Sequence, residues 1–141
     1  MLHLQLVTLS GTQFDDDVYE VVLPTLDGEI GILQNHMPLI SVATAGAVVV
    51  RKNRTDPDNK REIFAITGGV VQVEHNQLKI IVDEADHADS ISEAEAEAAH
   101  DRAQKLKAEA KDQVSLEHAQ QMIDRSAARL EVAKLKRRHQ R

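Results

Sequence analysis

The sequence predicts an α+β fold in which an N-terminal β-sandwich is followed by an antiparallel hairpin of two helices. All six glycines and all three prolines lie before residue 70. In that first part, short apolar runs alternate with turn residues, which is typical of strands. In the second part, alanine and leucine recur every three or four residues, which is typical of amphipathic helices. We therefore expect a β-sandwich domain over residues 1–86 and a helical hairpin over residues 87–141.

The expected strands follow one another at regular spacing. Apolar and polar residues alternate over residues 2–9, and a turn at 10–12 ends this first strand. The next strand, 18–23, is expected to stop at Pro24 because proline cannot donate to a strand ladder. The remaining expected strands are 30–33, 39–42, 47–51, 62–67, 70–74 and 78–82, with turns at 27–29 and 75–77 and a polar loop at 53–60. Strands at this spacing favour a sandwich or a flattened barrel.

The expected helices carry one small apolar stripe each. Ser90 and Glu93 match a capping box, so the first helix is expected to begin there. Its stripe comprises Ala96, Ala99, Ala103, Leu106 and Ala110, and the second comprises Leu116, Ala119, Ile123, Ala127, Leu130 and Ala133. Two helices joined by a short loop pack as an antiparallel hairpin. Because alanine buries little apolar area, the hairpin is expected to be marginal alone and a candidate for movement.

Charge is distributed unevenly along the chain. The formal net charge is −6, but residues 1–86 carry −7 and residues 125–141 carry +6. The bases of this last segment are Arg125, Arg129, Lys134, Lys136, Arg137, Arg138 and Arg141. They are interpreted either as a solvated end that complements the helix dipole or as an electrostatic arm for an acidic partner.

Several kinds of chemistry lack the residues they need. Residues 83–87 spell D-E-A-D-H, as in the magnesium-binding box of helicases, but no Gly-Lys dipeptide exists to complete a phosphate loop. The 56–61 segment begins like a calcium loop and then places Arg61 where glycine belongs. There is no cysteine, and the histidines lack zinc-ligand spacing. We expect no metal site, no cofactor and no catalytic residue.

Nucleic acid and membrane are also disfavoured as direct partners. The aromatic residues are only Phe14, Tyr19 and Phe64, too few to form a base-stacking platform. No apolar run approaches the roughly 20 residues that span a bilayer, and no basic region precedes the first apolar residues, as a signal or transit peptide requires. Any membrane association is expected to come through a partner.

Two strings resemble a known family. Residues 27–39, D-G-E-I-G-I-L-Q-N-H-M-P-L, and 66–73, I-T-G-G-V-V-Q-V, resemble the G-E-x-G-I-L-x-x-H-x-P-L and S-G-G-x-x-x-V signatures of the epsilon subunit of the rotary proton-translocating ATP synthase, called delta in mitochondria. The resemblance implies a non-catalytic central-stalk subunit that couples the gamma subunit to the c ring. It also implies C-terminal helices that inhibit ATP hydrolysis, and a peripheral location on the cytoplasmic face of the bacterial plasma membrane.

The resemblance also assigns roles to residues. It places Glu29 at the c ring and His36 at gamma. A solvated turn acid and a core-satisfied histidine are the respective alternatives. Gly28 and Gly31 would form the turn that presents Glu29, and Gly68 and Gly69 would serve a bulge or a close chain approach. The positive charge of the last segment, rather than the resemblance, predicts that the last helix faces acidic surfaces of the alpha/beta catalytic head through Arg125, Arg129, Lys134, Lys136, Arg137 and Arg138.

One family feature is altered here. Family members that bind ATP carry an I/L-D-x-x-R-A string at the start of the first helix, where this chain has I-S-E-A-E-A over residues 91–96. Ser92 replaces the acid and Glu95 replaces the cation, so a phosphate would face added negative charge. We expect no tight ATP binding. Two other functions stay open: a free-standing adaptor with a basic helical arm, and an ATPase that uses D-E-A-D-H as its metal box.

Overall fold

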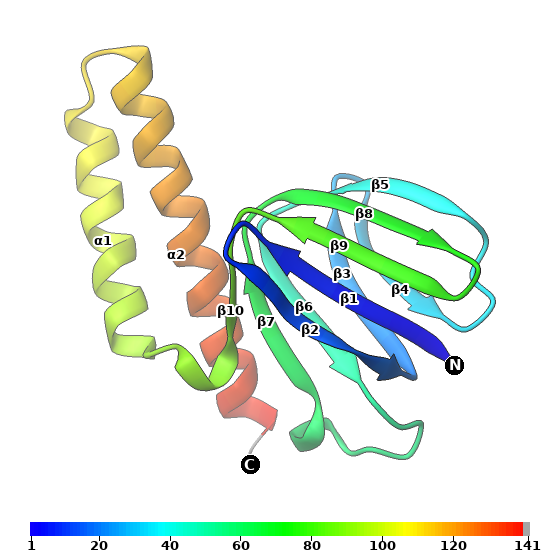
Figure 1. Cartoon of the computed structure of the whole chain (residues 1–141). Coiled ribbons are helices and arrows are strands. Elements are labelled where there is room, and N and C mark those ends of the chain that lie inside the picture. The colour runs from blue at the N-terminus through cyan, green and yellow to red at the C-terminus, as the bar shows by residue number, and fades with distance from the viewer. Residues whose placement is uncertain (140–141) are drawn as a thin grey trace.

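The computed structural model describes residues 1–139, in which ten strands form a folded-over sheet and two long helices stand beside it (Figure 1). The expected α+β class, a sandwich followed by a helical hairpin, is confirmed. Arg141, counted above in the basic segment, lies outside the described residues.

The strands form two layers that share one continuous ladder. Their order is β10-β7-β6-β3-β5-β8-β9-β1-β2, with β4 paired to the other side of β3. Every pairing is antiparallel except β1 with β9, and a single pair, Thr25 with Ala43, joins β3 to β5 where the ladder passes between layers. The strands are β1 Leu2–Thr8, β2 Gly11–Val18, β3 Glu20–Thr25, β4 Gly28–Leu33, β5 Leu39–Ala43, β6 Gly46–Arg51, β7 Glu62–Ile66, β8 Gly69–Glu74, β9 Gln77–Val82 and β10 Ala85–His87.

Strand alternation builds the core between the layers. Leu2, Leu4 and Leu6 of β1 are fully buried. They belong to one cluster with Val48 of β6 and Phe64 of β7, from the other layer. Because the side chains of a strand alternate between faces, the neighbours of Val48 and Phe64 are left on the outer face of β6 and β7. This outer face is where the helical hairpin packs.

Strand β2 is absent from the sequence prediction because its three consecutive aspartates break any alternation. Basic groups of two other segments, β1 and the loop after β6, compensate their charge. His3 of β1 donates from Nδ1 to Asp17 at 2.8 Å and from Nε2 to Asp15 at 2.5 Å, which raises the pKa of His3, while Lys52 lies 3.7 Å from Asp16. The acids lie on an edge strand of the sheet, where their charge also discourages pairing with a further strand.

One strand boundary and one further strand also differ from expectation. Strand β3 continues through Pro24, which lies between the residues that pair with β6 and the residue that pairs with β5. At this change of partner the missing N–H costs no ladder bond, and the Pro24 carbonyl accepts from Thr44 N–H at 3.1 Å. Strand β10 was also not expected, and it pairs with β7.

The helices are α1 Glu93–Glu109 and α2 Gln113–His139, and two short 3-10 turns cover Asp58–Lys60 and Ala88–Ser90. The capping box expected at Ser90 and Glu93 is wrong by two residues. Ser92 is the N-cap of α1, and its Oγ accepts from Glu95 N–H at 3.3 Å. Asp112 does the same for α2 by accepting from Ser115 N–H at 2.7 Å, which lowers the pKa of Asp112. Neither helix, over the residues described, is long and apolar enough to cross a membrane.

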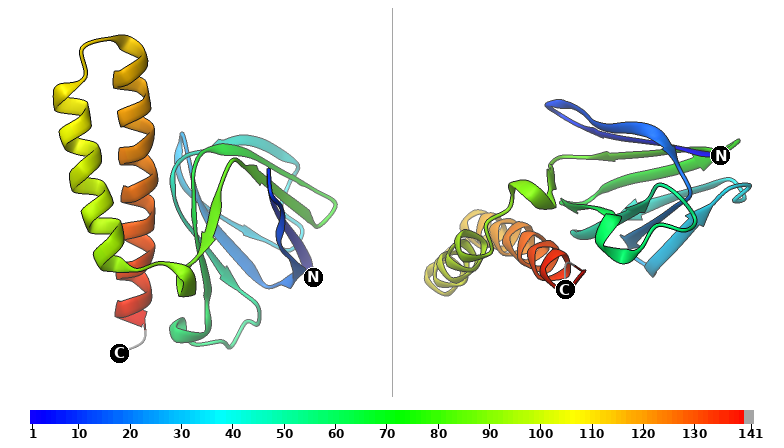
Figure 2. Two further views of the ribbon diagram at one scale, coloured as in Figure 1. Left: turned by 60° about the vertical axis from the view of Figure 1, so that its left-hand side comes forward. Right: turned by 90° about the horizontal axis from the view of Figure 1, so that it is seen from below.

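Helix α2, not α1, rests on the sandwich (Figure 2). Its Ala128 and Val132 pack in a separate cluster with Ile63 and Ala65 on the outer face of β7 and with Ala47 of β6. The opposite side of α2 faces α1, where Ala119 and Ser126 are buried. Helix α2 thus has two contact faces, whereas the sequence prediction gave it one stripe.

Candidate functional site

The turn between β3 and β4 presents Glu29 to solvent. Thr25 Oγ1 donates to the Gly28 carbonyl at 2.6 Å and accepts from Asp27 N–H at 3.2 Å. Gly28 has φ +107°, a conformation that side chains other than glycine rarely adopt. Glu29 follows as an exposed residue near the start of β4, and Leu26 in the same turn is 70% exposed. The tip therefore combines a carboxylate with an uncovered apolar side chain.

The other motif glycines have different surroundings. Gly31, expected in a turn, lies inside β4 opposite Val22, with nothing within 4 Å of the position of a Cβ. At Gly69 a Cβ would lie 2.0 Å from the carbonyl oxygen of Ile81, so β8 and β9 approach there as only glycine permits. At Gly68 the nearest atom would be the Ala43 carbonyl oxygen at 3.2 Å.

His36 lies in the loop between β4 and β5, at the opposite end of β4 from Glu29. Its ring is half-buried, and Nδ1 donates to the Met37 carbonyl at 2.7 Å. With a rise of about 3.3 Å per residue, the strand from Glu29 to Leu33 alone spans roughly 13 Å. The structure therefore does not bring Glu29 and His36 together, and one small contact cannot cover both.

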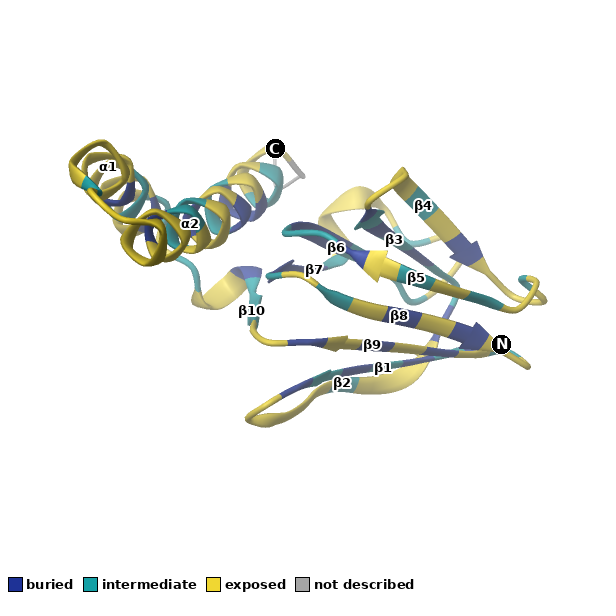
Figure 3. Cartoon of the chain, turned by 90° about the horizontal axis from the view of Figure 1, so that it is seen from above, coloured by how far each residue is buried: buried dark blue, intermediate teal, exposed yellow. Residues whose placement is uncertain are grey.

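Sequence reasoning missed an apolar surface on the outer face of β5, β8 and β9. Ile40 and Val42 of β5, Val70 of β8 and Ile81 of β9 are 73%, 48%, 47% and 45% exposed. The ladder places Val42 opposite Val70 and Val70 opposite Ile81, so three of these side chains form a row across the sheet. Figure 3 shows exposed stretches along these strands. The available signal was β5 itself, in which polar residues do not alternate with apolar ones.

Four bases of α2 are paired with the chain's own carboxylates. The acids all lie in the segment from residue 84 to residue 93, which runs from the end of β9 to the first turn of α1. We call these four ion pairs the clasp. Its ion pairs are Arg125 Nε–Glu84 Oε2 at 2.6 Å, Arg129 Nη1–Asp86 Oδ2 at 2.7 Å, Lys136 Nζ–Asp89 Oδ1 at 2.5 Å and Arg137 Nη1–Glu93 Oε1 at 3.1 Å. Within residues 1–139, no ion pair is recorded for Lys134 or Arg138.

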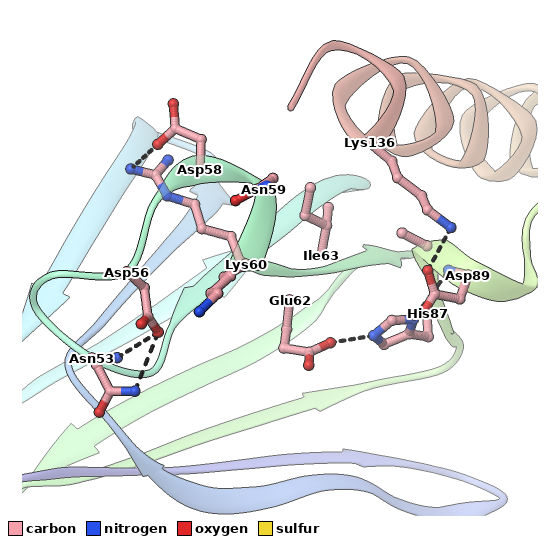
Figure 4. Close-up of a pocket in the computed structure, with 12 residues that line it drawn as sticks. Asn53, Asp56, Asp58, Asn59, Lys60, Glu62, Ile63, His87, Asp89 and Lys136 are labelled. Atoms are coloured by element: carbon pink, nitrogen blue, oxygen red, sulfur yellow. Dashed lines mark hydrogen bonds and ion pairs between the residues drawn. The ribbon is translucent and has the colours of Figure 1, made fainter. Parts of the chain in front are cut away.

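The D-E-A-D-H string is largely accounted for by these contacts. Besides Glu84 and Asp86 of the clasp, His87 donates from Nε2 to Glu62, and its Nδ1 accepts from Asp89 N–H at 3.0 Å (Figure 4). Glu62, His87 and Asp89 line a surface cavity of about 510 Å³. Lys136 lines it too, and its contact with Asp89 lowers the pKa of that carboxyl. Among the described residues, no group of three or more metal-ligating side chains is placed to hold a metal ion.

A groove of about 490 Å³ lies between the two helices. It is lined by Glu95, which stands where ATP-binding family members have a cation, and by the three arginines Arg102, Arg125 and Arg129. Two of these arginines already face carboxylates in the clasp. Ser92 is occupied as the cap of α1. The groove therefore offers an anion less positive charge than its arginines suggest.

Comparison with known proteins gives consistent matches. Residues 1–88 match the family model described as ATP synthase, Delta/Epsilon chain, beta-sandwich domain. The ATP synthase epsilon chain of Halalkalibacterium halodurans is 34% identical, covering 94% of this chain and 96% of the relative, and that of Sulfurihydrogenibium sp. is 36% identical, covering 96% and 99%.

Solved structures show the same fold at low identity. A chain in the mitochondrial ATP synthase of Euglena gracilis, solved as OSCP/F1/c-ring, superposes with a TM-score of 0.77 at 18% identity, covering 90% of this chain and 78% of that one. A chain in the central stalk and c-ring of the Tetrahymena thermophila mitochondrial ATP synthase gives 0.61 at 16% identity, covering 94% and 96%.

Proposed function

Since the chain belongs to the family of ATP synthase delta/epsilon chains, we propose that it is a non-catalytic subunit of the central stalk that joins the gamma subunit to the c ring and restrains ATP hydrolysis through its helices. The complex would hold it at the cytoplasmic face of a bacterial plasma membrane as a peripheral component.

The uncovered apolar surface of β5, β8 and β9 is the observation that carries the gamma contact. Contiguous exposed apolar residues on a small domain mark an interaction surface. The opposite outer face, on β6 and β7, is covered by α2, so β5, β8 and β9 are available for a partner. His36 precedes β5 by three residues, which places the proposed gamma contact at the margin of this surface.

Glu29 suits a second partner at a different end of the sandwich. Its carboxylate is exposed on a fixed turn, and a c subunit that presents polar or basic loop groups would pair with it. Leu26 beside it supplies apolar area. Two contacts at opposite ends of β4 fit a subunit that bridges two neighbours.

The clasp gives the proposed brake two classes of basic residue. Lys136 and Arg137 are engaged with the chain's own acids in the docked hairpin, whereas Lys134 and Arg138 are exposed on the surface of α2. We propose that the docked hairpin is the non-inhibitory state, and that on release all of these bases face acidic surfaces of the alpha/beta head. Exposed ion pairs contribute about 0–1 kcal/mol each, so several must act together.

Binding to purified gamma tests the stalk assignment. The double variant I40D/V42D should lower affinity at least about tenfold, because two carboxylates would be desolvated in an apolar contact. V114D changes an exposed valine on α2, remote from this surface, and should leave affinity unchanged. If the unaltered chain does not bind gamma, the free-standing adaptor becomes the better interpretation.

Hydrolysis by the assembled enzyme tests the brake. Neutralising three of the four clasp acids in E84Q/D86N/D89N leaves every base in place and weakens the hold on the hairpin, so ATP hydrolysis should fall. K134A/R138A leaves the clasp intact and weakens the proposed head contact, so ATP hydrolysis should rise, and it should rise less at high salt.

Two larger changes test the same brake. Changing Lys134, Lys136, Arg137 and Arg138 together to alanine should also raise ATP hydrolysis. Truncation before Ser90 should raise it at least as much. If all of these enzymes hydrolyse ATP at the unmodified rate, the helices are not a brake.

A further inference from the structure

A pair of asparagines joins two turns that are far apart in the sequence. Asn35 N–H donates to Asn76 Oδ1 at 2.6 Å, and Asn76 Nδ2 donates to Asn35 Oδ1 at 3.4 Å. The Asn76 carbonyl also accepts from His3 N–H at 2.9 Å. Asn76 therefore connects three segments: the β8–β9 turn, the start of β1 and the loop between β4 and β5.

The loop of residues 34–38 has little else to fix its position. Its other recorded hydrogen bonds are local, from His36 N–H to the Leu33 carbonyl at 3.2 Å and from the His36 ring to Met37. In the part of the chain described, only the bonds to Asn76 tie this loop to a distant segment. Met37 is 72% exposed, so the loop is not anchored by burial of that side chain either.

We propose that Asn76 is a positioning residue, whose side-chain amide holds the 34–38 loop in the one conformation that presents His36 and Met37 beside Ile40 to gamma. This inference rests on the proposed gamma contact. A loop that is already ordered loses less conformational freedom when it binds, so the amide raises affinity without touching the partner.

A purely local role for Asn76 predicts something different. Asn76 has φ +62° and follows His75 with φ +50°, a left-handed turn that asparagine and glycine both favour. If the asparagine serves only this backbone conformation, glycine should replace it without consequence. N76G therefore retains the turn and removes only the amide.

The experiment uses the full chain with three variants: N76G, N76D and H75G. N76D keeps an acceptor for Asn35 N–H but loses the longer bond that Asn76 Nδ2 donates to Asn35 Oδ1, so it should retain most of the loop order. H75G changes the adjacent left-handed residue, whose side chain is 86% exposed. Hydrogen exchange of residues 34–38 reports the loop, thermal unfolding reports the sandwich, and surface-immobilised gamma reports binding.

For N76G we expect an unchanged unfolding temperature, hydrogen exchange at Asn35 faster by about tenfold, and an affinity for gamma lower by about three- to tenfold. N76D should retain most of the exchange protection and of the affinity, and H75G should change neither. Unchanged exchange in N76G would overturn the ordering role. Faster exchange with unchanged affinity would overturn the role in binding. If the unaltered chain itself fails to bind gamma, the stalk assignment fails and the role of Asn76 in presenting the loop to gamma fails with it, while exchange decides separately whether Asn76 orders the loop.

Discussion

Gly31 lies in the first signature string, residues 27–39, and Gly69 lies in the second, residues 66–73, but the two glycines have different surroundings. A Cβ at Gly69 would meet backbone atoms of both Ile81 and Val82, at 2.0 Å and 2.8 Å, whereas a Cβ at Gly31 would meet nothing within 4 Å. Glycine is needed at residue 69 for β8 and β9 to approach each other, whereas the chain itself does not need glycine at residue 31. A requirement for glycine at Gly31 would therefore have to come from a partner that approaches β4.

We predict that G69A destabilises the chain by about 1–3 kcal/mol or more, because the β8–β9 ladder must separate, while G31A changes stability by less than about 1 kcal/mol. Urea unfolding followed by circular dichroism measures both. Equal midpoints for the two variants would contradict the close approach. If G31A is stable yet binds the c ring or gamma poorly, Gly31 lies in a contact.

The start of α1 leads to a second prediction, on nucleotide binding. Ser92 and Glu95 replace an acid and a cation, and Arg125 and Arg129 are engaged by Glu84 and Asp86. Calorimetric titration with magnesium-ATP should show no dissociation constant in the low micromolar range. S92D/E95R retains a capping side chain and adds a cation, so affinity should rise if the rest of the groove is suitable. Tight binding by the unaltered chain would refute the prediction.

Among the elements, α2 depends on charge for part of its docking. Its apolar contact with the sheet is made largely by Ala128 and Val132, which bury little area. The clasp adds four ion pairs along the same helix. Because Lys136 lowers the pKa of Asp89, that pair contributes stability above the ordinary pKa of aspartate and loses it as pH falls through the lowered value.

We predict that docking of α2 weakens in salt near 1 M and again in acid. The chain has no cysteine, so A127C/K79C gives two label sites on α2 and β9. Electron–electron distances between spin labels should be narrow at low salt and broaden at high salt. Adding R125A/R129A should broaden them already at low salt, and adding K134A/R138A should not. A distribution that ignores both salt and R125A/R129A would mean that apolar packing alone holds the helix.

The elements also indicate where sequence patterns suffice and where they fail. Eight strands and both helices follow from alternation, turn residues and helical spacing. Strand β2 does not, because its aspartates are paired with His3 of another strand. The second face of α2 does not either, because it is defined by Ile63 and Ala65 of β7. The site follows the same rule. Motif strings single out Glu29 and His36, but the row of Val42, Val70 and Ile81 exists only once the register is known.

At the scale of the whole molecule, the sandwich is predicted to fold without the hairpin. Its inter-layer core is complete by Val82, so a chain ending at Glu84 should be soluble and β-rich by circular dichroism and should still bind gamma. It lacks β10 and α2, which leaves Ala47, Ile63 and Ala65 uncovered. We expect it to bind a hydrophobic dye more than the full chain does. A random-coil spectrum would show that the two parts fold only together.

The partial contact of α2 makes the hairpin a lever. The helix is roughly 40 Å long at 1.5 Å per residue, but its apolar packing on the sheet is made by Ala128, Val132 and Leu135 in its C-terminal half. Its other half borders a groove beside Thr67 and Gly68. A tilt of about 10° about the docked end would displace the first turn of α2 by roughly 3–4 Å. Thermal fluctuations are therefore amplified toward the tip near Val114, and any neighbour that touches this tip exerts leverage on the clasp without reaching it.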